Sequence, residues 1–197
     1  MKKIILGSAS IIRKTLLSNA GIDFVVDPAT IDENSIKESL ELERTSHEDI
    51  VQTLSDFKAL NRASIWPNDI IISCDQILSH KGKIFSKPEN IISAKKQISI
   101  LNGSKHHLIT AATIIENKEI VWRNISKSEM LMRNLNDNEI TNYVEKIGED
   151  ITKSVGGYMI EREGIKLFEK IKGDYFSILG IPLLEIINFL NNKKLLV

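Results

Sequence analysis

The chain has 197 residues, of which 42% are hydrophobic and 26% charged, a composition typical of a globular protein with a sizeable core. Its 26 basic residues equal its 26 acidic ones, which argues against nucleic acid or an anionic membrane as a partner, because both favour a basic excess. The single cysteine, Cys74, excludes an internal disulfide framework and favours a reducing cytoplasm. Lys2 and Lys3 precede an apolar run too short for a signal peptide or a membrane span.

The first predicted turn indicates an anion site. A strand at residues 4–6 ends in small residues and leads into a helix with Arg13 and Lys14 in its first turn. A helix start offers free N–H groups and the positive end of its dipole to an anion. Ser8 and Ser10 add hydroxyl groups, and Arg13 adds a guanidinium that suits phosphate. We expect phosphate here, with simple capping of the helix by Ser10 as the alternative.

The next segments alternate between strands and helices. Residues 22–26 predict a strand, residues 31–34 a polar turn, and residues 47–64 a helix with Ser46 as its N-cap. Lys58 lies late in this helix, where a solvated lysine is the simplest interpretation.

A central strand follows at residues 70–74, a continuous apolar run typical of a strand buried on both faces. It ends in Asp75 and Gln76. Open α/β sheets place ligand sites at the carboxyl ends of their strands. Burying a carboxylate costs free energy, and such carboxylates cluster at functional sites. We favour a functional Asp75 over a turn-forming one, because Ile77 and Leu78 continue the strand pattern.

The rest of the chain continues the alternation. His106 and His107 have no cysteine or carboxylate at ligand spacing, so we take them as residues that begin a strand. Lys87, before Pro88, has a loop lysine as its simplest interpretation. Helices are expected between residues 90 and 101 and at residues 137–147 and 183–190. Strands are expected at residues 84–85, 107–115, 119–122 and 126–132, in a glycine-hinged segment at 153–161, and as a strand or turn pair within 164–176.

In their order and spacing, the motifs resemble those of the Maf family of nucleoside triphosphate pyrophosphatases. The matches run through nearly the whole chain: residues 6–10, Arg13, Leu16, Leu17, Asp32, Glu33, Lys58, Ala59, Asp75, Gln76, Lys87, Pro88, residues 101–103, Gly157, Tyr158 and residues 173–176 and 179–183. Departures include Lys14, where many relatives have arginine, and Ile11 and Ile12, where relatives carry proline and a larger residue.

The resemblance implies an α/β fold with an elongated mixed sheet flanked by helices, with two lobes around a central cleft, in a single domain over residues 1–197. It implies cleavage of a nucleoside triphosphate into the monophosphate and pyrophosphate, with a divalent metal cation (Mg²⁺ or Mn²⁺), in a cytoplasmic house-cleaning role and often as a homodimer. Carried over, Asp75 is the catalytic carboxylate, and Glu33 and Asp75 are candidate metal ligands. The expected substrate-binding residues are Ser8, Ser10, Arg13, Lys14, Lys58, Gln76, Lys87 and Glu161.

Gln76 and Glu161 match the members of the family that act on 7-methyl-GTP, whereas pyrimidine-acting members resemble threonine and glutamine there. A carboxylate accepts from both adjacent donors of guanine, but it would oppose an acceptor of uracil. We therefore expect a guanine-type, methylated base. The alternatives are dTTP or UTP as substrate, with Glu161 paired to Arg162 or Lys166 on the surface.

Two other functions stay open on the sequence alone. One is a non-hydrolysing, nucleotide-binding regulator of septum formation, against which Asp75, Lys58 and Lys87 argue, because binding alone needs no water-activating carboxylate. The other is a phosphatase that releases orthophosphate, which product analysis distinguishes.

Overall fold

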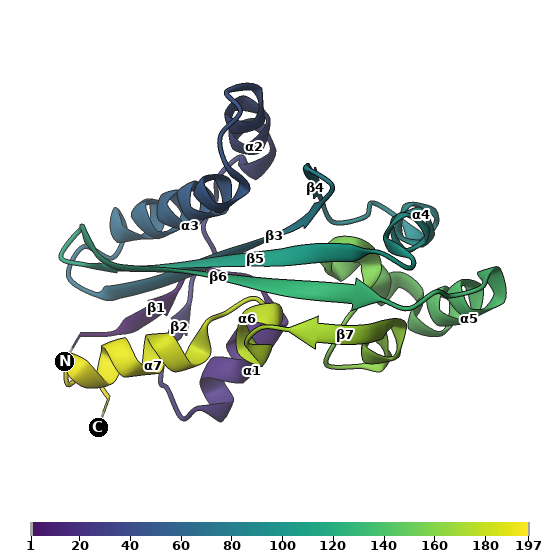
Figure 1. Cartoon of the computed structure of the whole chain (residues 1–197). Coiled ribbons are helices and arrows are strands. Elements are labelled where there is room, and N and C mark those ends of the chain that lie inside the picture. The colour runs from purple at the N-terminus through teal and green to yellow at the C-terminus, as the bar shows by residue number, and fades with distance from the viewer. Residues whose placement is uncertain (1, 197) are drawn as a thin grey trace. The chain divides into compact units, whose positions relative to one another are not determined.

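The computed structural model describes residues 2–196 and has an α/β fold built on a mixed seven-stranded sheet (Figure 1). The strands are β1 (Ile4–Leu6), β2 (Val25–Val26), β3 (Ile70–His80), β4 (Lys83–Phe85), β5 (Lys105–Glu116), β6 (Glu119–Met132) and β7 (Phe168–Lys172). They are ordered β2-β1-β3-β5-β6-β7, with β4 paired to β3. β1 pairs in parallel with β2 and β3, whereas β4 and β7 pair antiparallel to β3 and β6. The predicted fold class is confirmed.

Helices flank the sheet strands. They are α1 (Ile11–Asn19), α2 (Glu33–Leu42), α3 (His47–Ala63), α4 (Ile91–Leu101), α5 (Asp137–Ile147), α6 (Tyr175–Ile178) and α7 (Leu183–Asn192), with 3₁₀ turns η1 (Gly148–Lys153), η2 (Val155–Gly157) and η3 (Glu163–Leu167). Within residues 2–196, no helix combines the length and apolar character needed to cross a membrane.

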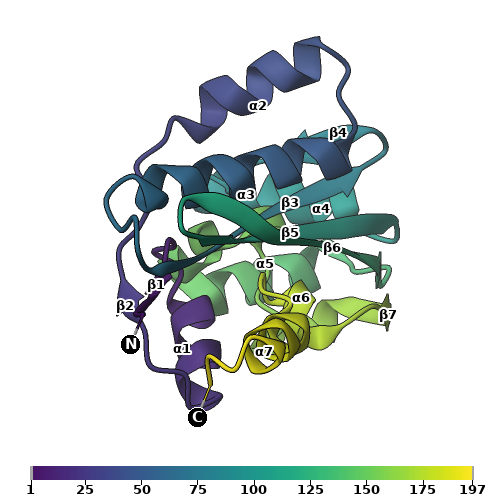
Figure 2. The ribbon, with the colours of Figure 1, turned by 90° about the vertical axis from the view of Figure 1, so that its left-hand side faces the viewer.

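The chain divides into two compact units, and β3, β5 and β6 contribute residues to both. Unit 1 comprises the chain up to Gln76, Thr110–Ser126 and the chain from Asp174 onward, and unit 2 comprises Ile77–Ile109 and Lys127–Gly173. In unit 1, α2 and α3 lie on one side of the sheet strands and α1 and α7 on the other (Figure 1 and Figure 2).

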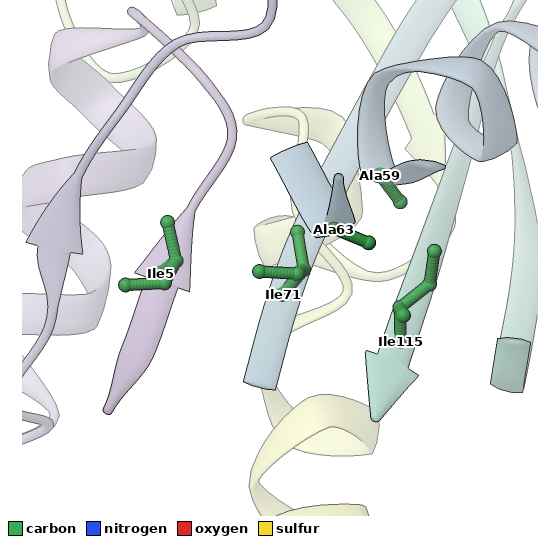
Figure 3. Packing of buried hydrophobic residues seen from close by; sticks show 5 residues of the cluster. All are labelled: Ile5, Ala59, Ala63, Ile71 and Ile115. Atoms are coloured by element: carbon green, nitrogen blue, oxygen red, sulfur yellow. The ribbon is translucent and has the colours of Figure 1, made fainter. Parts of the chain in front are cut away.

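The core of unit 1 holds α3 closely against the sheet. Ala59 and Ala63 of α3 pack on Ile5, Ile71 and Ile115 of β1, β3 and β5 (Figure 3). All five residues are buried. Because alanine is small, the helix backbone can approach the strands, and polar side chains next to the alanines then reach the sheet as well.

The alternation of β3 decides which side chains face α3. Successive side chains of a strand point to opposite faces. Since Ile71 packs under α3, Ser73 and Asp75 lie on that same face, whereas Cys74 and Gln76 lie on the opposite one. The middle of β3 therefore presents an acid toward α3 and an amide toward the other side.

Five expectations about secondary structure differ from the structure. The central strand expected at residues 70–74 continues to His80, so Asp75 and Gln76 lie within β3 and do not follow its end. The strand expected at residues 22–26 is reduced to Val25–Val26. The predicted strands at residues 119–122 and 126–132 are one strand, β6. The polar turn at residues 31–34 opens a helix, α2, because Asp32 caps it by accepting from Ser35 N–H. Residues 153–161 form 3₁₀ turns in place of a strand, and Gly156, at φ 76°, has the left-handed backbone that breaks extended structure.

Candidate active site

An acid, a lysine and a second acid converge in unit 1. Lys58 Nζ lies 2.5 Å from Asp75 Oδ1 and 3.0 Å from Glu33 Oε2. Asp75 is 6% exposed and Lys58 is 8% exposed, whereas 44% of the Glu33 side chain is exposed. The three groups come from β3, α3 and α2. A buried ion pair with a water-accessible carboxylate beside it is the chemical centre of this unit.

The local sequence explains why these groups meet. Lys58 adjoins Ala59, whose packing brings α3 close to β3, and one turn earlier Ser55 Oγ donates to Ser73 O at 3.1 Å. This hydrogen bond and the alanine contact tie α3 to the strand on both sides of Lys58. Glu33 is the first residue of α2, so the N-cap at Asp32 fixes the position of the Glu33 backbone.

The first turn gathers Ser8 and Arg13, as expected, but the guanidinium bonds to the protein itself. Arg13 Nη1 donates to Ser8 Oγ at 2.9 Å and to Cys74 O at 2.8 Å, and Arg13 Nε donates to Gly180 O at 2.7 Å. Arg13 is buried. It therefore joins the start of α1, the middle of β3 and the turn after α6, and its contact with phosphate stays a prediction.

The two serines of the first turn have different roles. Ser10 is the N-cap of α1 and accepts from Arg13 N–H at 3.5 Å, as in the simpler interpretation. Ser8 Oγ accepts from Ser10 N–H at 3.3 Å as well as from Arg13, so its own proton is available as a donor. Lys14 is exposed on α1. Ser8 and the start of α1 thus keep the character of an anion site.

Gln76 lies on the face opposite Asp75. Its Nε2 donates to Thr110 Oγ1 at 2.9 Å and to Ser177 O and Ile178 O, each at 3.0 Å. All four residues belong to unit 1. The amide nitrogen is therefore used to hold the α6 turn, and a contact of Gln76 with a base stays a prediction.

Lys87 and Glu161 belong to unit 2 and are both exposed. Arg162 pairs with Asp150 at 2.8 Å and Lys166 with Glu163 at 3.3 Å. The two cations considered as surface partners of Glu161 thus bind other acids. The participation of Lys87 and Glu161 in the site stays a prediction.

The sequence reasoning missed a polar cluster beside this centre. Asn61 and Arg62 follow Lys58 by three and four positions on α3, and they bind the loop before α2 through Asp27 and Thr30. Side chains at this spacing share one face of a helix. That spacing from Lys58 was the available signal, but both residues also fit an ordinary solvated helix surface.

Asp75 and Glu33 suit a metal that binds together with a substrate. No group of three or more His, Cys, Asp or Glu side chains among residues 2–196 could hold a metal ion. Asp75 and Glu33, however, direct one oxygen each at a single cationic point, which the Lys58 ammonium occupies. Mg²⁺ is usually held by one or two carboxylates together with substrate phosphates, so this pair fits such a cation.

Cys74, next to Asp75 in β3, takes no part in nucleophilic chemistry. It is fully buried, and burial raises the pKa of its thiol to about 11. The thiolate is the reactive form of cysteine, so the thiol is inert in the folded chain.

Comparison with known proteins identifies the family. The family model described as "Maf-like protein" matches residues 3–193. The chain therefore belongs to the Maf family.

Individual relatives match over almost their whole lengths. A nucleoside triphosphate pyrophosphatase of Ruegeria sp. (strain TM1040) is 39% identical over 187 residues, which cover 95% of this chain and 94% of the relative. A 7-methyl-GTP pyrophosphatase of Rhizobium meliloti (strain 1021) is 39% identical over 185 residues, covering 94% and 93%. A 7-methyl-GTP pyrophosphatase of Brucella abortus biovar 1 (strain 9-941) is 38% identical over 192 residues, covering 98% and 96%.

Proposed function

We propose that this chain hydrolyses nucleoside triphosphates between the α and β phosphates, releasing the nucleoside monophosphate and pyrophosphate. The observation that carries the proposal is the buried Asp75 carboxylate, in contact with Lys58 and directed to the α3 face from the middle of a central strand. Membership of the Maf family and the names of the relatives support the same reaction.

The chemistry follows from the residues of unit 1. A water oxygen attacks the α-phosphorus while the bond from that phosphorus to the bridging oxygen breaks, and pyrophosphate leaves with that oxygen. The proton of the water passes to Asp75, the carboxylate within reach. Lys58 and the Ser8 hydroxyl donate to phosphate oxygens, and the free amides of α1 add their positive end. These donors stabilise the negative charge that develops on the leaving pyrophosphate.

We propose that Asp75 and Glu33 hold the divalent cation, Mg²⁺ or Mn²⁺, together with substrate oxygens. Such a cation supplies charge neutralisation for the leaving pyrophosphate. Because the Lys58 ammonium occupies the point between the two carboxylates, Lys58 must move from them to a phosphate oxygen. Its flexible stem permits this exchange.

For the base, we propose a guanine-type nucleotide, with 7-methyl-GTP as the leading candidate. The two relatives named 7-methyl-GTP pyrophosphatase support this choice. Glu161 supports it because a carboxylate accepts both from N1–H and from the amine of guanine. A dTTP or UTP pyrophosphatase is the alternative within the same family.

We also propose a single Maf-like domain over residues 1–197, since β3, β5 and β6 run through both units. The cytoplasm, where nucleoside triphosphates are made and used, is the proposed location. The family resemblance also leads us to propose a homodimer, and light scattering of the purified chain, which gives its molar mass, tests this.

The test is a hydrolysis panel that resolves the products, run with Mg²⁺ on the wild type and on Asp75→Asn. The panel contains 7-methyl-GTP, GTP, dTTP and UTP. We expect pyrophosphate as the product, with 7-methyl-GTP as the best substrate. Loss of a general base lowers rates by about 10²- to 10⁴-fold, so Asp75→Asn should lose turnover to this extent while nucleotide binding persists.

Each alternative has its own signature in the same panel. Orthophosphate as the first product would mean a phosphatase. No turnover by the wild type, with nucleotide binding intact in both proteins, would mean a regulator. Rapid hydrolysis of dTTP and UTP with 7-methyl-GTP ignored would overturn the choice of base but keep the reaction.

A further inference from the structure

The packing of α2 gives the position of Glu33 only weak support. None of the ten residues of α2, all within the described chain, is buried, although α2 contacts α3. Helices in proteins gain most of their stability from packing of an apolar face. Glu33 nevertheless contacts Lys58 at 3.0 Å, so polar contacts on either side of it must hold it there.

The loop before α2 is bound to α3 by side chains that we name the α3 clasp: Asp27, Asn61, Arg62 and Trp66. Asn61 Oδ1 accepts from Thr30 N–H at 3.1 Å. Arg62 Nη1 donates to Asp27 Oδ1 at 2.9 Å, and Trp66 Nε1 donates to Asp27 Oδ2 at 2.7 Å. Both carboxylate oxygens of Asp27 are thus occupied by donors on or just after α3.

On the α3 side, the residues of the α3 clasp are held by contacts with one another and with the core. Asn61 Oδ1 also accepts from Arg62 Nε at 3.1 Å and from Arg62 Nη2 at 2.6 Å, which locks the two side chains together. Arg62 is buried, and a Cβ added to Gly7 would lie 3.3 Å from its Cγ, so the stem of Arg62 runs against the first turn. Trp66 packs on the core cluster beneath α3.

Only two residues separate Thr30, the last one bound by the α3 clasp, from Glu33, and Asp32 between them caps α2. The helix that carries Lys58 therefore also carries the groups that place Glu33 next to Lys58. We propose that Asp27, Asn61 and Arg62 are positioning residues for Glu33 and so set the affinity of the active site for its divalent cation. This inference rests on the proposed function, because it uses Glu33 as a metal ligand.

The experiment measures metal affinity in two ways for Asn61→Ala, which removes the acceptor of Thr30 N–H. One readout is the Mg²⁺ concentration that gives half-maximal activity. The other is Mn²⁺ binding, measured by electron paramagnetic resonance, with and without the non-hydrolysable GTP analogue that carries an α,β-methylene bridge. Partners that orient a ligand typically change metal affinity by 10- to 100-fold. We expect about a 10-fold loss in both readouts, with kcat at saturating Mg²⁺ little changed.

Two further variants separate positioning from general destabilisation. Arg123→Ala removes a bifurcated hydrogen bond on another part of α3, in which Arg123 Nε donates to both oxygens of Asp56 at 3.2 and 3.0 Å, so it should lower the melting temperature slightly but leave Mn²⁺ affinity unchanged. In a Glu33→Gln background, Asn61→Ala should weaken Mn²⁺ binding no further, because its effect passes through Glu33.

An unchanged Mn²⁺ affinity in Asn61→Ala, or a loss of the same size with and without Glu33, would overturn the inference. If the wild type releases no pyrophosphate while the Mn²⁺ affinities follow the expected pattern, the proposed function fails and the positioning role stands.

Discussion

At the scale of single residues, the feature that stands out is a lysine between two carboxylates, at the point where we propose that the divalent cation binds. Lys58 satisfies one oxygen from each of two carboxylates, and one of those carboxylates is buried. Breaking a buried pair by removing one partner is costly, because a desolvated charge remains. Lys58 therefore stabilises the chain before any nucleotide binds, in addition to its proposed contact with phosphate.

This gives a prediction for Lys58→Met, which keeps the stem and removes the charge. The free energy of unfolding should fall by about 3 kcal/mol, as for other broken buried pairs. Added Mn²⁺ should raise the melting temperature of the variant more than that of the wild type, because the point between the carboxylates is then open to a cation. Scanning calorimetry with and without Mn²⁺ measures both effects.

The control for Lys58 is the double variant Lys58→Met/Asp75→Asn. It should lose less stability than the sum of the single variants, and most of the response to Mn²⁺ should disappear. Equal stabilisation of wild type and Lys58→Met by Mn²⁺ would contradict the interpretation of Lys58 as a cation substitute.

Individual residues also show how far the sequence reasoning reached. Asp75 and Lys58 could be singled out because an acid follows an apolar run and a family motif supports the lysine, and the structure brings the two into contact. Gln76 was expected to bind substrate; as neighbouring residues of a strand face opposite sides, it lies away from Asp75, and its contact with substrate stays a prediction. Arg13 was expected to bind phosphate, and only the folded chain reveals that it bonds to Cys74 O and Gly180 O.

At the scale of elements, periodicity predicted the buried segments and failed on the exposed ones. α2 was missed because its apolar face is narrow, with Ile36 and Leu40 half-buried and no residue fully buried. Two strands were predicted in place of β6, because its middle is polar and no side chain in its first nine residues is fully buried. The cap of α2 is local, from Asp32 to Ser35, whereas β6 pairs with β7, a partner distant in the sequence.

Arg13 and Gln76 together hold one such element, the α6 turn. Between them they donate to the carbonyls of Ser177, Ile178 and Gly180. Carbonyls that lose their donors expose the turn to local opening. The C-terminal motif of the family is thus tied to the N-terminal one by side chains from α1 and β3.

Gln76→Met keeps the length of the side chain and removes its donors. Amide hydrogen exchange in residues 175–181 should become faster by about 10-fold, the equivalent of one lost hydrogen bond of about 1.4 kcal/mol. Exchange in α3 should stay unchanged. Lys14→Ala, an exposed neighbour of Arg13 on α1, is the matched control, and equal acceleration in that variant would mean that the turn opens independently of Gln76.

At the scale of the whole molecule, a buried histidine makes stability depend on pH. His106 in β5 is fully buried, shares a 2.7 Å hydrogen bond with the Tyr158 hydroxyl and lies beside the Phe168 ring. Burial lowers the pKa of His106 from 6.5 to about 3. Below pH 6.5 the unfolded chain therefore takes up a proton that the folded chain refuses, and folding loses free energy as the pH falls.

The expected loss is about 1.4 kcal/mol per pH unit between pH 6.5 and about pH 4. His106→Phe removes the titrating group and should flatten this slope by that amount in urea unfolding experiments. Tyr158→Phe removes only the hydroxyl partner, so it should lower stability at every pH and keep the slope. A slope unchanged in His106→Phe would assign the acid sensitivity to other groups.

The strict alternation of β3 also limits how the gene for this chain can change in length. Deleting or inserting one codon just ahead of Asp75 would turn the carboxylate toward the α6 turn and bring an uncharged side chain under Lys58. The apolar run would still form a strand, so such a protein would fold but would lack the Asp75 carboxylate beside Lys58. A change of two residues would restore the face but move the carboxylate about 7 Å along the strand from Lys58, so this part of β3 should tolerate no change in length.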